Sequence, residues 1–473
     1  MPPNFIIKTK PLYHQAQGRY FLIDCESPDF VLAIAFWKRI SSLSRILWQH
    51  KITNKTISTP NSDLHPPSPL ESILADDMSL GESLQAISLV AHTLNSARNY
   101  QKSSLSTISG CQETIIVFPK RLIENWEEEI NKHTHPNNLH VLRYHGSNCC
   151  KDFVIKSIQR NIIITAYETL RMDFRSTPKG PVYDYQWYRV ILDEAHVIRN
   201  SHAHVHAAVM SLQTKNRLCL TGTPLNNSLS DYMSLFEFIS CNQPWDGILQ
   251  KHLEIGDLKP FHMVTRHLML CQLKTVVLPS LPLICEEEVF RPLPSTIRLY
   301  YDRIFMENLS EYLYTDEAKE EKKKSKRRNL LVSIQQLRCL CNHLILAETT
   351  SSREEVDYSN FSEAQTGTGL NITCGQIVFI MDPHWNPSQE SQAIDRLHRI
   401  GQSSIMKVFR FISQDTIEIN IQRVQEHKKK LMRSTVLMTF DWEIMSYKRI
   451  CETSFYKFKE SNKTGIPPSF KIT

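Results

Sequence analysis

Residues 187–196 read Trp-Tyr-Arg-Val-Ile-Leu-Asp-Glu-Ala-His, an apolar run that ends in an acidic pair. Similar short apolar runs occur at 114–118, 162–165, 217–220 and 376–380. Helical patterns lie between them, for example at 121–132 and 228–240. Buried strands that alternate with helices are typical of parallel, doubly wound α/β sheets. In such sheets the chemistry lies beyond the carboxyl ends of the strands, where Asp193 and Glu194 stand.

The composition is that of an ordinary globular protein. The 473 residues are 41% hydrophobic and 22% charged, which excludes a disordered or collagen-like chain. The length predicts about three domains. Glycine is scarce, with 13 residues in the chain, whereas its usual share is roughly 7%. Any phosphate loop in this chain therefore has to work with few glycines.

Charge and cysteine usage limit the partners and the compartment. The net charge of +6 permits an anionic partner such as nucleic acid without requiring one. The 12 cysteines form no Cys-x-x-Cys pair, so we expect no zinc finger and an intracellular protein with reduced thiols. The longest strongly apolar run, residues 30–37, is too short to span a bilayer, and no membrane partner is expected.

Three segments at strand ends carry residues that are suited to catalysis or ligand binding. Asp193 and Glu194 would hold a magnesium ion and orient a water, although such a pair can also cap the next segment. Residues 221–227, Thr-Gly-Thr-Pro-Leu-Asn-Asn, suit a loop that senses a ligand or, equally, an ordinary turn. Arg396 and Arg399 would share a helix face and reach one phosphate, although surface arginines are the common alternative.

These segments together resemble the Swi/Snf-type helicase-like, DNA-dependent ATPases of helicase superfamily two, and among them the transcription termination factor two (lodestar) branch. The resemblance extends from about residue 73 to 436. Its first part is carried by ILADDMSLGESLQAISLV (73–90), IIVFPKRLIENWEEEI (115–130), LRYHGS (142–147), IIITAYETLR (162–171), WYRVILDEAHVIRN (187–200) and LTGTPLNNSLSDYMSLFEFI (220–239). Its second part is carried by LRCLCNHLILAE (337–348), GTGLNIT (367–373) and DPHWNPSQESQAIDRLHRIGQ (382–402).

The resemblance implies an α/β fold of two RecA-like, doubly wound parallel-sheet lobes that close around ATP, with duplex DNA across both. The implied divisions are an N-terminal region with a Pro-rich insert (1–72), an ATP-binding lobe (73–245), a helical linker with a basic run (246–335), a C-terminal helicase lobe (336–436) and a tail (437–473). Only 18 residues separate His343 from Ser362, where about three βα units of ~30 residues each are expected. The second lobe is therefore expected to be truncated.

The resemblance also assigns roles to single residues. Asp193 and Ser83 would hold Mg²⁺, Glu194 would polarise the attacking water, and Arg396 and Arg399 would act as arginine fingers. The other implied nucleotide contacts are Gln15, Ser79, Gly81 and Glu82. The residues implied to couple the nucleotide to DNA are Thr165, Thr221, Gly222, Thr223 and Gly369.

The phosphate loop departs from the family pattern. Where that pattern reads A-D-E/D-M-G-L-G-K-T, residues 75–83 read Ala-Asp-Asp-Met-Ser-Leu-Gly-Glu-Ser. Glu82 thus stands in place of the phosphate-binding lysine. The exchange removes an attraction and adds a repulsion, each roughly 4 kcal/mol at ~4 Å and an effective dielectric constant of ~20. We therefore expect ATP turnover to be impaired.

Other segments carry further expectations. Residues 33–39 look like the helix that follows a motif containing Gln15, and the Pro-rich residues 52–71 indicate a loop or insertion. Residues 271–274, Cys-Gln-Leu-Lys, stand where the family has Arg-Arg-Thr-Lys. The charge run at 318–328 is typical of a solvated helix face, and its part at 322–328 is also compatible with a nuclear import signal.

The expected function is that of a nuclear, DNA-dependent ATPase and translocase that acts on duplex DNA in transcription, chromatin or repair. Its cofactors would be ATP and Mg²⁺, with turnover impaired by Glu82. Its DNA contacts would be directed at phosphates and sensitive to salt. Chromatin or a transcription complex is the expected protein partner. The alternative is a non-catalytic DNA- or chromatin-binding relic, or the product of an incomplete gene model.

Overall fold

The structure is a computed structural model of the chain, and its contacts divide it into two compact units. It describes residues 6–27, 36–41, 46–59, 71–103, 109–146, 160–200, 203–222, 229–240, 251–252, 255, 257, 259–314, 332–342 and 375–440. The first unit is drawn from Met1–Asp76, Glu82–Gln272 and Leu431–Thr473, and the second from Asp77–Gly81 and Leu273–Lys430. The predicted gap in the second lobe, the charge run at 318–328, Thr223 and Gly369 all lie outside the described residues.

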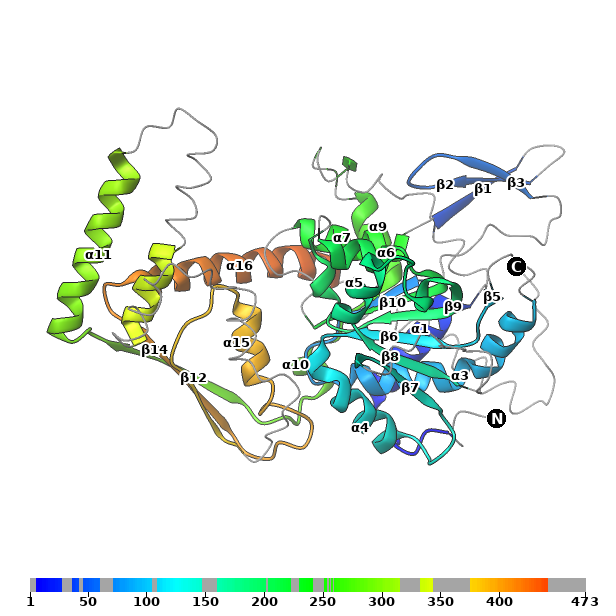
Figure 1. Cartoon of the computed structure of the whole chain (residues 1–473), viewed down its shortest axis with the longest axis horizontal. Coiled ribbons are helices and arrows are strands. Elements are labelled where there is room, and N and C mark those ends of the chain that lie inside the picture. The colour runs from blue at the N-terminus through cyan, green and yellow to red at the C-terminus, as the bar shows by residue number, and fades with distance from the viewer. Residues whose placement is uncertain are drawn as a thin grey trace. The chain divides into compact units, whose positions relative to one another are not determined.

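A large parallel sheet forms the centre of the first unit (Figure 1). Its strands run in the order β11 (Met269–Leu270), β4 (Glu71–Leu74), β10 (Gln213–Leu220), β9 (Tyr185–Leu192), β6 (Thr114–Phe118), β8 (Ile162–Ala166) and β7 (Val141–Tyr144). The short strand β5 (Ser109–Gly110) pairs with β9. Every pairing is parallel. The predicted α/β class and the predicted strands of this sheet are confirmed.

Helices cover both faces of this sheet, because alternate side chains of each strand point to opposite sides. In β6, Ile115 and Val117 join one core, whereas Ile116 and Phe118 join another. The first core packs against α5 (Tyr167–Arg175), α6 (His204–Met210), α7 (Leu229–Ser240) and α9 (Lys259–Leu268). The second packs against α1 (Tyr13–Glu26), α3 (Glu82–Ser103) and α4 (Ile123–His133). The first lobe is therefore doubly wound, as predicted.

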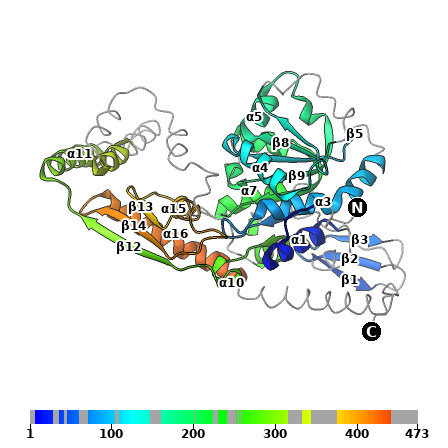
Figure 2. The same ribbon diagram turned by 90° about the horizontal axis from the view of Figure 1, so that it is seen from below.

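A small antiparallel sheet is the main departure from the predicted elements of the first unit. It consists of β1 (Trp37–Ser41), β2 (Ile46–His50) and β3 (Thr56–Thr59), which lie side by side in Figure 2. The prediction of a helix over 33–39 is wrong for residues 37–39, which lie in β1, whereas Phe36 is helical. The predicted loop at 52–71 contains the strand β3. Aromatic and β-branched residues favour a pleated surface, and Trp37 and Trp48 are both buried there.

The same sheet predicts an acid-sensitive step in stability. His50 is buried, and its Nδ1 accepts a hydrogen bond from the Thr53 backbone N–H (3.2 Å). Burial, followed by the charge of Lys55, lowers the His50 pKa from 6.5 to about 4. The unfolded chain therefore binds this proton first, and the stabilisation present above pH 6.5 is lost as the pH falls towards 4.

We expect the free energy of unfolding in urea to fall by about 2 kcal/mol between pH 7 and pH 5 through this residue. His50→Asn keeps an acceptor for Thr53 and does not titrate, so it should flatten that part of the profile. An unchanged profile in this variant would show that other groups cause the acid sensitivity.

The second unit also contains a parallel sheet, ordered β12 (Ile284–Arg291), β14 (Met406–Ser413) and β13 (Ile377–Ile380). The helix α15 (Pro387–Ile394) packs on one face, where Ile394 meets Met406 and Val408. The described residues of this unit also form α10 (Lys274–Val277), α11 (Ser295–Tyr314), a helix at 332–342 and, up to Lys430, the first part of α16 (Ile417–Phe440). Residues 246–335, expected as a helical linker, thus also contribute the edge strand β12. Among the described helices, none is long and apolar enough to cross a membrane.

Candidate nucleotide site

The predicted phosphate loop lies between β4 and α3. The neighbouring strand ends are tied to β4, because Thr221 N–H donates to Leu74 O (3.0 Å) and Ala75 N–H donates to Leu270 O (2.7 Å). Within the loop, Ser79 (φ 68°) and Gly81 (φ 93°) adopt left-handed backbone conformations. A loop at the carboxyl end of a strand that leads into a helix N-terminus is where a phosphate binds in doubly wound folds.

Glu82 is the first residue of α3, and its side chain turns back onto the loop. Its Oε1 accepts a hydrogen bond from the Asp76 backbone N–H (3.1 Å). Burial raises the pKa of Glu82 well above its usual value, and the charges of Asp76, Asp193 and Glu194 raise it further. Ser83 follows as the second residue of the helix. The residue in place of a cation is therefore an internal hydrogen-bond acceptor within an acidic cluster.

Asp76 binds two other segments of the chain at this acidic cluster, a role that the sequence prediction missed. It is fully buried, and its Oδ2 accepts from Gln85 Nε2 (2.9 Å). Its Oδ1 accepts from the backbone N–H of Gln272 (3.0 Å), in the segment that departs from the Arg-Arg-Thr-Lys pattern. The quoted segment around residues 73–90 contained Asp76, but no spacing in the sequence distinguishes it from its neighbour Asp77.

The predicted acidic pair lies at the end of β9, as expected. Asp193 Oδ2 accepts from Trp126 Nε1 (2.7 Å), and Asp193 Oδ1 accepts from the backbone N–H of Glu194 (2.9 Å). Burial and then the charge of Glu194 raise the pKa of Asp193 to about 7. Glu194 has a left-handed backbone (φ 49°), and its carboxylate lies 3.2 Å from His196 Nδ1. Trp126 is a second residue that the sequence prediction missed.

These residues do not fit a magnesium-bound triphosphate. The charges of Asp76, Asp193 and Glu194 all act on Glu82, which stands where the family pattern has its phosphate-binding lysine, and the charge of Glu194 acts on Asp193. Both oxygens of Asp193 already accept hydrogen bonds within the protein. At position 82 a polyanion would meet a carboxyl group in place of a cation, so the Coulomb attraction that a lysine supplies is missing.

The remaining predicted residues of the first unit have structural contacts. Gln15 is buried near the start of α1, and its Oε1 accepts from Leu12 N–H (2.9 Å). Thr165 is also buried and donates its hydroxyl to Tyr144 O (2.8 Å). Thr221 and Gly222 follow β10 beside the end of β4. Thr221 and Gly222 thus lie next to the loop, whereas the hydroxyl of Thr165 is used inside the sheet.

The two predicted arginines lie beyond a helix and not on its face. The helix α15 ends at Ile394, and Arg396 and Arg399 follow in turns. Beyond Ile394 the bonding shortens to i, i−3 at Leu397 N–H to Ile394 O (3.0 Å), and the N–H of Arg399 bonds Leu397 O (3.0 Å), two residues back. The expectation of a shared helix face is therefore wrong, because the i, i+3 spacing holds only while the helix continues.

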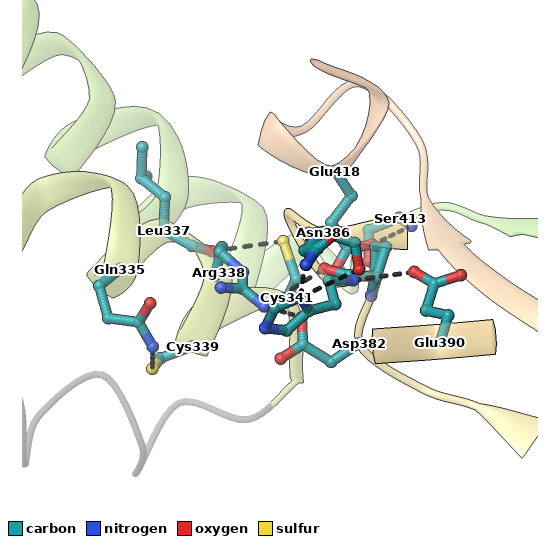
Figure 3. A network of polar contacts seen from close by, with 12 residues as sticks. Gln335, Leu337, Arg338, Cys339, Cys341, Asp382, Asn386, Glu390, Ser413 and Glu418 are labelled. Atoms are coloured by element: carbon teal, nitrogen blue, oxygen red, sulfur yellow. Dashed lines mark hydrogen bonds and ion pairs between the residues drawn. The ribbon is translucent and has the colours of Figure 1, made fainter. Parts of the chain in front are cut away.

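A polar network fixes the loop that leads into α15 (Figure 3). Arg338 Nη2, from the helix at 332–342, donates to Asp382 Oδ1 (2.8 Å). Glu390 in α15 accepts from the backbone N–H of His384 (2.9 Å) and from Arg410 Nε (3.0 Å). Because these partners are charged or buried, the path of the chain towards the arginine segment is well defined.

The segment Asp77–Gly81 belongs to the second unit by its contacts and meets the arginine segment. Arg399 Nε donates to Ser79 Oγ (2.7 Å), and Ser79 Oγ donates to Asp395 O (3.0 Å). The buried Lys274 forms an ion pair with Asp395 and donates from its backbone N–H to Asp77 Oδ2 (2.8 Å). Lys274 was noted in the sequence only as the last residue of a departing motif.

Comparison with known families places these features in context. The family model of the SNF2-related domain matches residues 14–346, and that of the helicase conserved C-terminal domain matches residues 318–401. One solved structure among the matches is the Sulfolobus solfataricus SWI2/SNF2 ATPase core in complex with dsDNA. It has 18% sequence identity, covers 92% of this chain and 94% of that chain, and gives a TM-score of 0.41.

Several curated proteins are similar in sequence. The probable global transactivator of Orgyia pseudotsugata multicapsid polyhedrosis virus is 24% identical, over 80% of this chain and 88% of that protein. The SWI/SNF-related matrix-associated actin-dependent regulator of chromatin subfamily A member 1 of Mus musculus is 26% identical, over 76% of this chain and 41% of that protein. The DNA repair protein RAD5A of Arabidopsis thaliana is 28% identical, over 64% of this chain and 35% of that protein. The chain thus spans less than half the length of the latter two relatives.

Proposed function

This chain belongs to the family of the SNF2-related domain, and from that premise we propose that it binds duplex DNA through a helicase-like ATPase fold whose ATP turnover is impaired at Glu82. One observation carries the proposal. The Glu82 carboxylate accepts a hydrogen bond from the loop amide of Asp76 and is surrounded by the charges of three further carboxylates. At position 82 the chain thus carries a carboxyl group where the family pattern has a cation.

The proposal that the chain binds duplex DNA is supported by its family membership and by the names of related proteins. These names include a regulator of chromatin, a DNA repair protein and a TATA-binding protein-associated factor. We infer duplex DNA as the partner, contacted mainly through its phosphates, in the nucleus and in a chromatin or transcription setting. The resemblance of the motif segments to the transcription termination factor two (lodestar) branch favours transcription among these settings.

The test measures DNA binding and ATP hydrolysis on the same full chain. We expect fluorescence anisotropy to show binding to duplexes of unrelated sequence, with log affinity falling linearly with log salt. We expect ATP hydrolysis with saturating duplex to equal that of Glu194→Gln, a matched background control. Hydrolysis stimulated by DNA and abolished in Glu194→Gln would overturn the impairment. No binding to duplex DNA at low salt would overturn the DNA assignment.

A further inference from the structure

Ser79 is an unusual residue for its backbone conformation. Its φ of 68° lies in the left-handed region, which glycine adopts without steric cost and a residue with a Cβ atom rarely adopts. Its hydroxyl has two partners: Asp395 O, to which it donates (3.0 Å), and Arg399 Nε, from which it accepts (2.7 Å). The side chain whose Cβ atom disfavours this backbone conformation therefore also carries the hydroxyl that binds Asp395 and Arg399.

Charged contacts beside Ser79 hold the same two segments together, residues 77–81 and 395–399. Lys274 is buried and donates from its Nζ to His398 O (2.9 Å) as well as pairing with the Asp395 carboxylate. The backbone N–H of Lys274 donates to Asp77 Oδ2 (2.8 Å), two residues before Ser79. Hydrogen bonds to charged groups are about twice as strong as neutral ones. The contacts between residues 77–81 and 395–399 therefore hold Arg399 in a defined position.

We propose that Ser79 is an internal ligand of Arg399, an autoinhibitory contact that engages the guanidinium which would otherwise bind a phosphate. A guanidinium binds phosphate oxygens in pairs through parallel N–H donors, and Nε is one of the donors that such a pair uses. With Nε directed at Ser79 Oγ, a phosphate must displace the hydroxyl before it can bind the edge of the guanidinium formed by Nε and its neighbouring Nη. The contact acts separately from Glu82, and the inference rests on the proposed function only in assigning a nucleotide to the loop.

The test is made in the Glu82→Lys background, so that repulsion by Glu82 does not hide the effect of Ser79. Equilibrium binding of a fluorescent ATP analogue with Mg²⁺ is measured on the full chain, without relying on turnover. Ser79→Ala and Ser79→Gly both remove the hydroxyl, and we expect each to tighten binding about tenfold over Glu82→Lys alone. In the additional presence of Arg399→Ala, we expect the substitution at position 79 to have no effect on affinity.

Several outcomes would overturn the inference. One is an unchanged affinity in Ser79→Ala, and another is a gain in Ser79→Gly only, which would assign the effect to backbone freedom. A gain that persists without Arg399 would also contradict it. The same comparison in Glu82→Gln provides a second background should Glu82→Lys fail to fold, as judged by its melting temperature. Failure of the proposed function is seen separately, as DNA-stimulated hydrolysis by the unaltered chain.

Discussion

Replacement of Glu82 by lysine is expected to tighten binding of magnesium-bound ATP to the full chain by at least about a hundredfold. The new ammonium group would attract phosphate oxygens and would also lie among the carboxylates of Asp76, Asp193 and Glu194, whose charges act on position 82. The hydrogen bond from Asp76 N–H to Glu82 is lost, which frees a loop amide that can donate to a phosphate. Both changes act in the same direction.

Two control variants separate the contributions to this gain. Glu82→Gln removes the ionisable carboxyl group without adding a positive charge, and we expect a smaller gain, of no more than about tenfold. Glu128→Lys makes the same change of charge on the exposed surface of α4, and we expect nucleotide affinity to remain within about twofold. Isothermal titration calorimetry measures all three. An affinity that stays unchanged in folded Glu82→Lys would show that repulsion at this position does not limit nucleotide binding.

The central sheet could be predicted from the sequence because its strands are buried on both faces. Residues 114–118 and 162–166 are continuous apolar or β-branched runs, and they appear as β6 and β8 with nearly the predicted bounds. The sheet at 37–59 was missed because its strands are short and include the polar run Thr56–Thr59. Its register depends on cross-strand pairs such as Trp37 with His50, which local patterns do not reveal.

The candidate site was predictable only for residues that stand directly at strand ends. Asp193 and Glu194 follow β9 as expected, and Glu82 opens α3. The partners that decide their chemistry come from distant parts of the chain. Trp126 reaches Asp193 over 67 positions, and Gln272 reaches Asp76 over 196 positions. Such contacts depend on the packed fold, so no spacing in the sequence contains them.

Removal of the Glu26 carboxylate is expected to cost about 3–5 kcal/mol of unfolding free energy in the first unit. Glu26 ends α1 and forms a buried ion pair with Arg189 in β9. Arg189 also donates to Thr114 Oγ1 (3.1 Å) and Thr93 Oγ1 (2.8 Å), and it is fully buried. Glu26→Gln therefore leaves a guanidinium inside the protein without its counter-charge, and the desolvation cost is no longer offset.

The double variant Glu26→Gln/Arg189→Met removes both charges and should recover most of that loss, because no unpaired ion remains buried. Urea unfolding, followed by tryptophan fluorescence, measures the unfolding free energies of the unaltered chain, of Glu26→Gln, of Arg189→Met and of the double variant. Glu124→Gln, which breaks the exposed pair with Arg143 (3.1 Å), is the matched control and should cost less than about 1 kcal/mol. If the double variant were as unstable as Glu26→Gln, the ion pair would not be what holds α1 to β9. Because Asp193 directly follows β9 and accepts a hydrogen bond from Trp126, we expect Glu26→Gln also to expose Trp126, seen as a red shift of its emission before global unfolding.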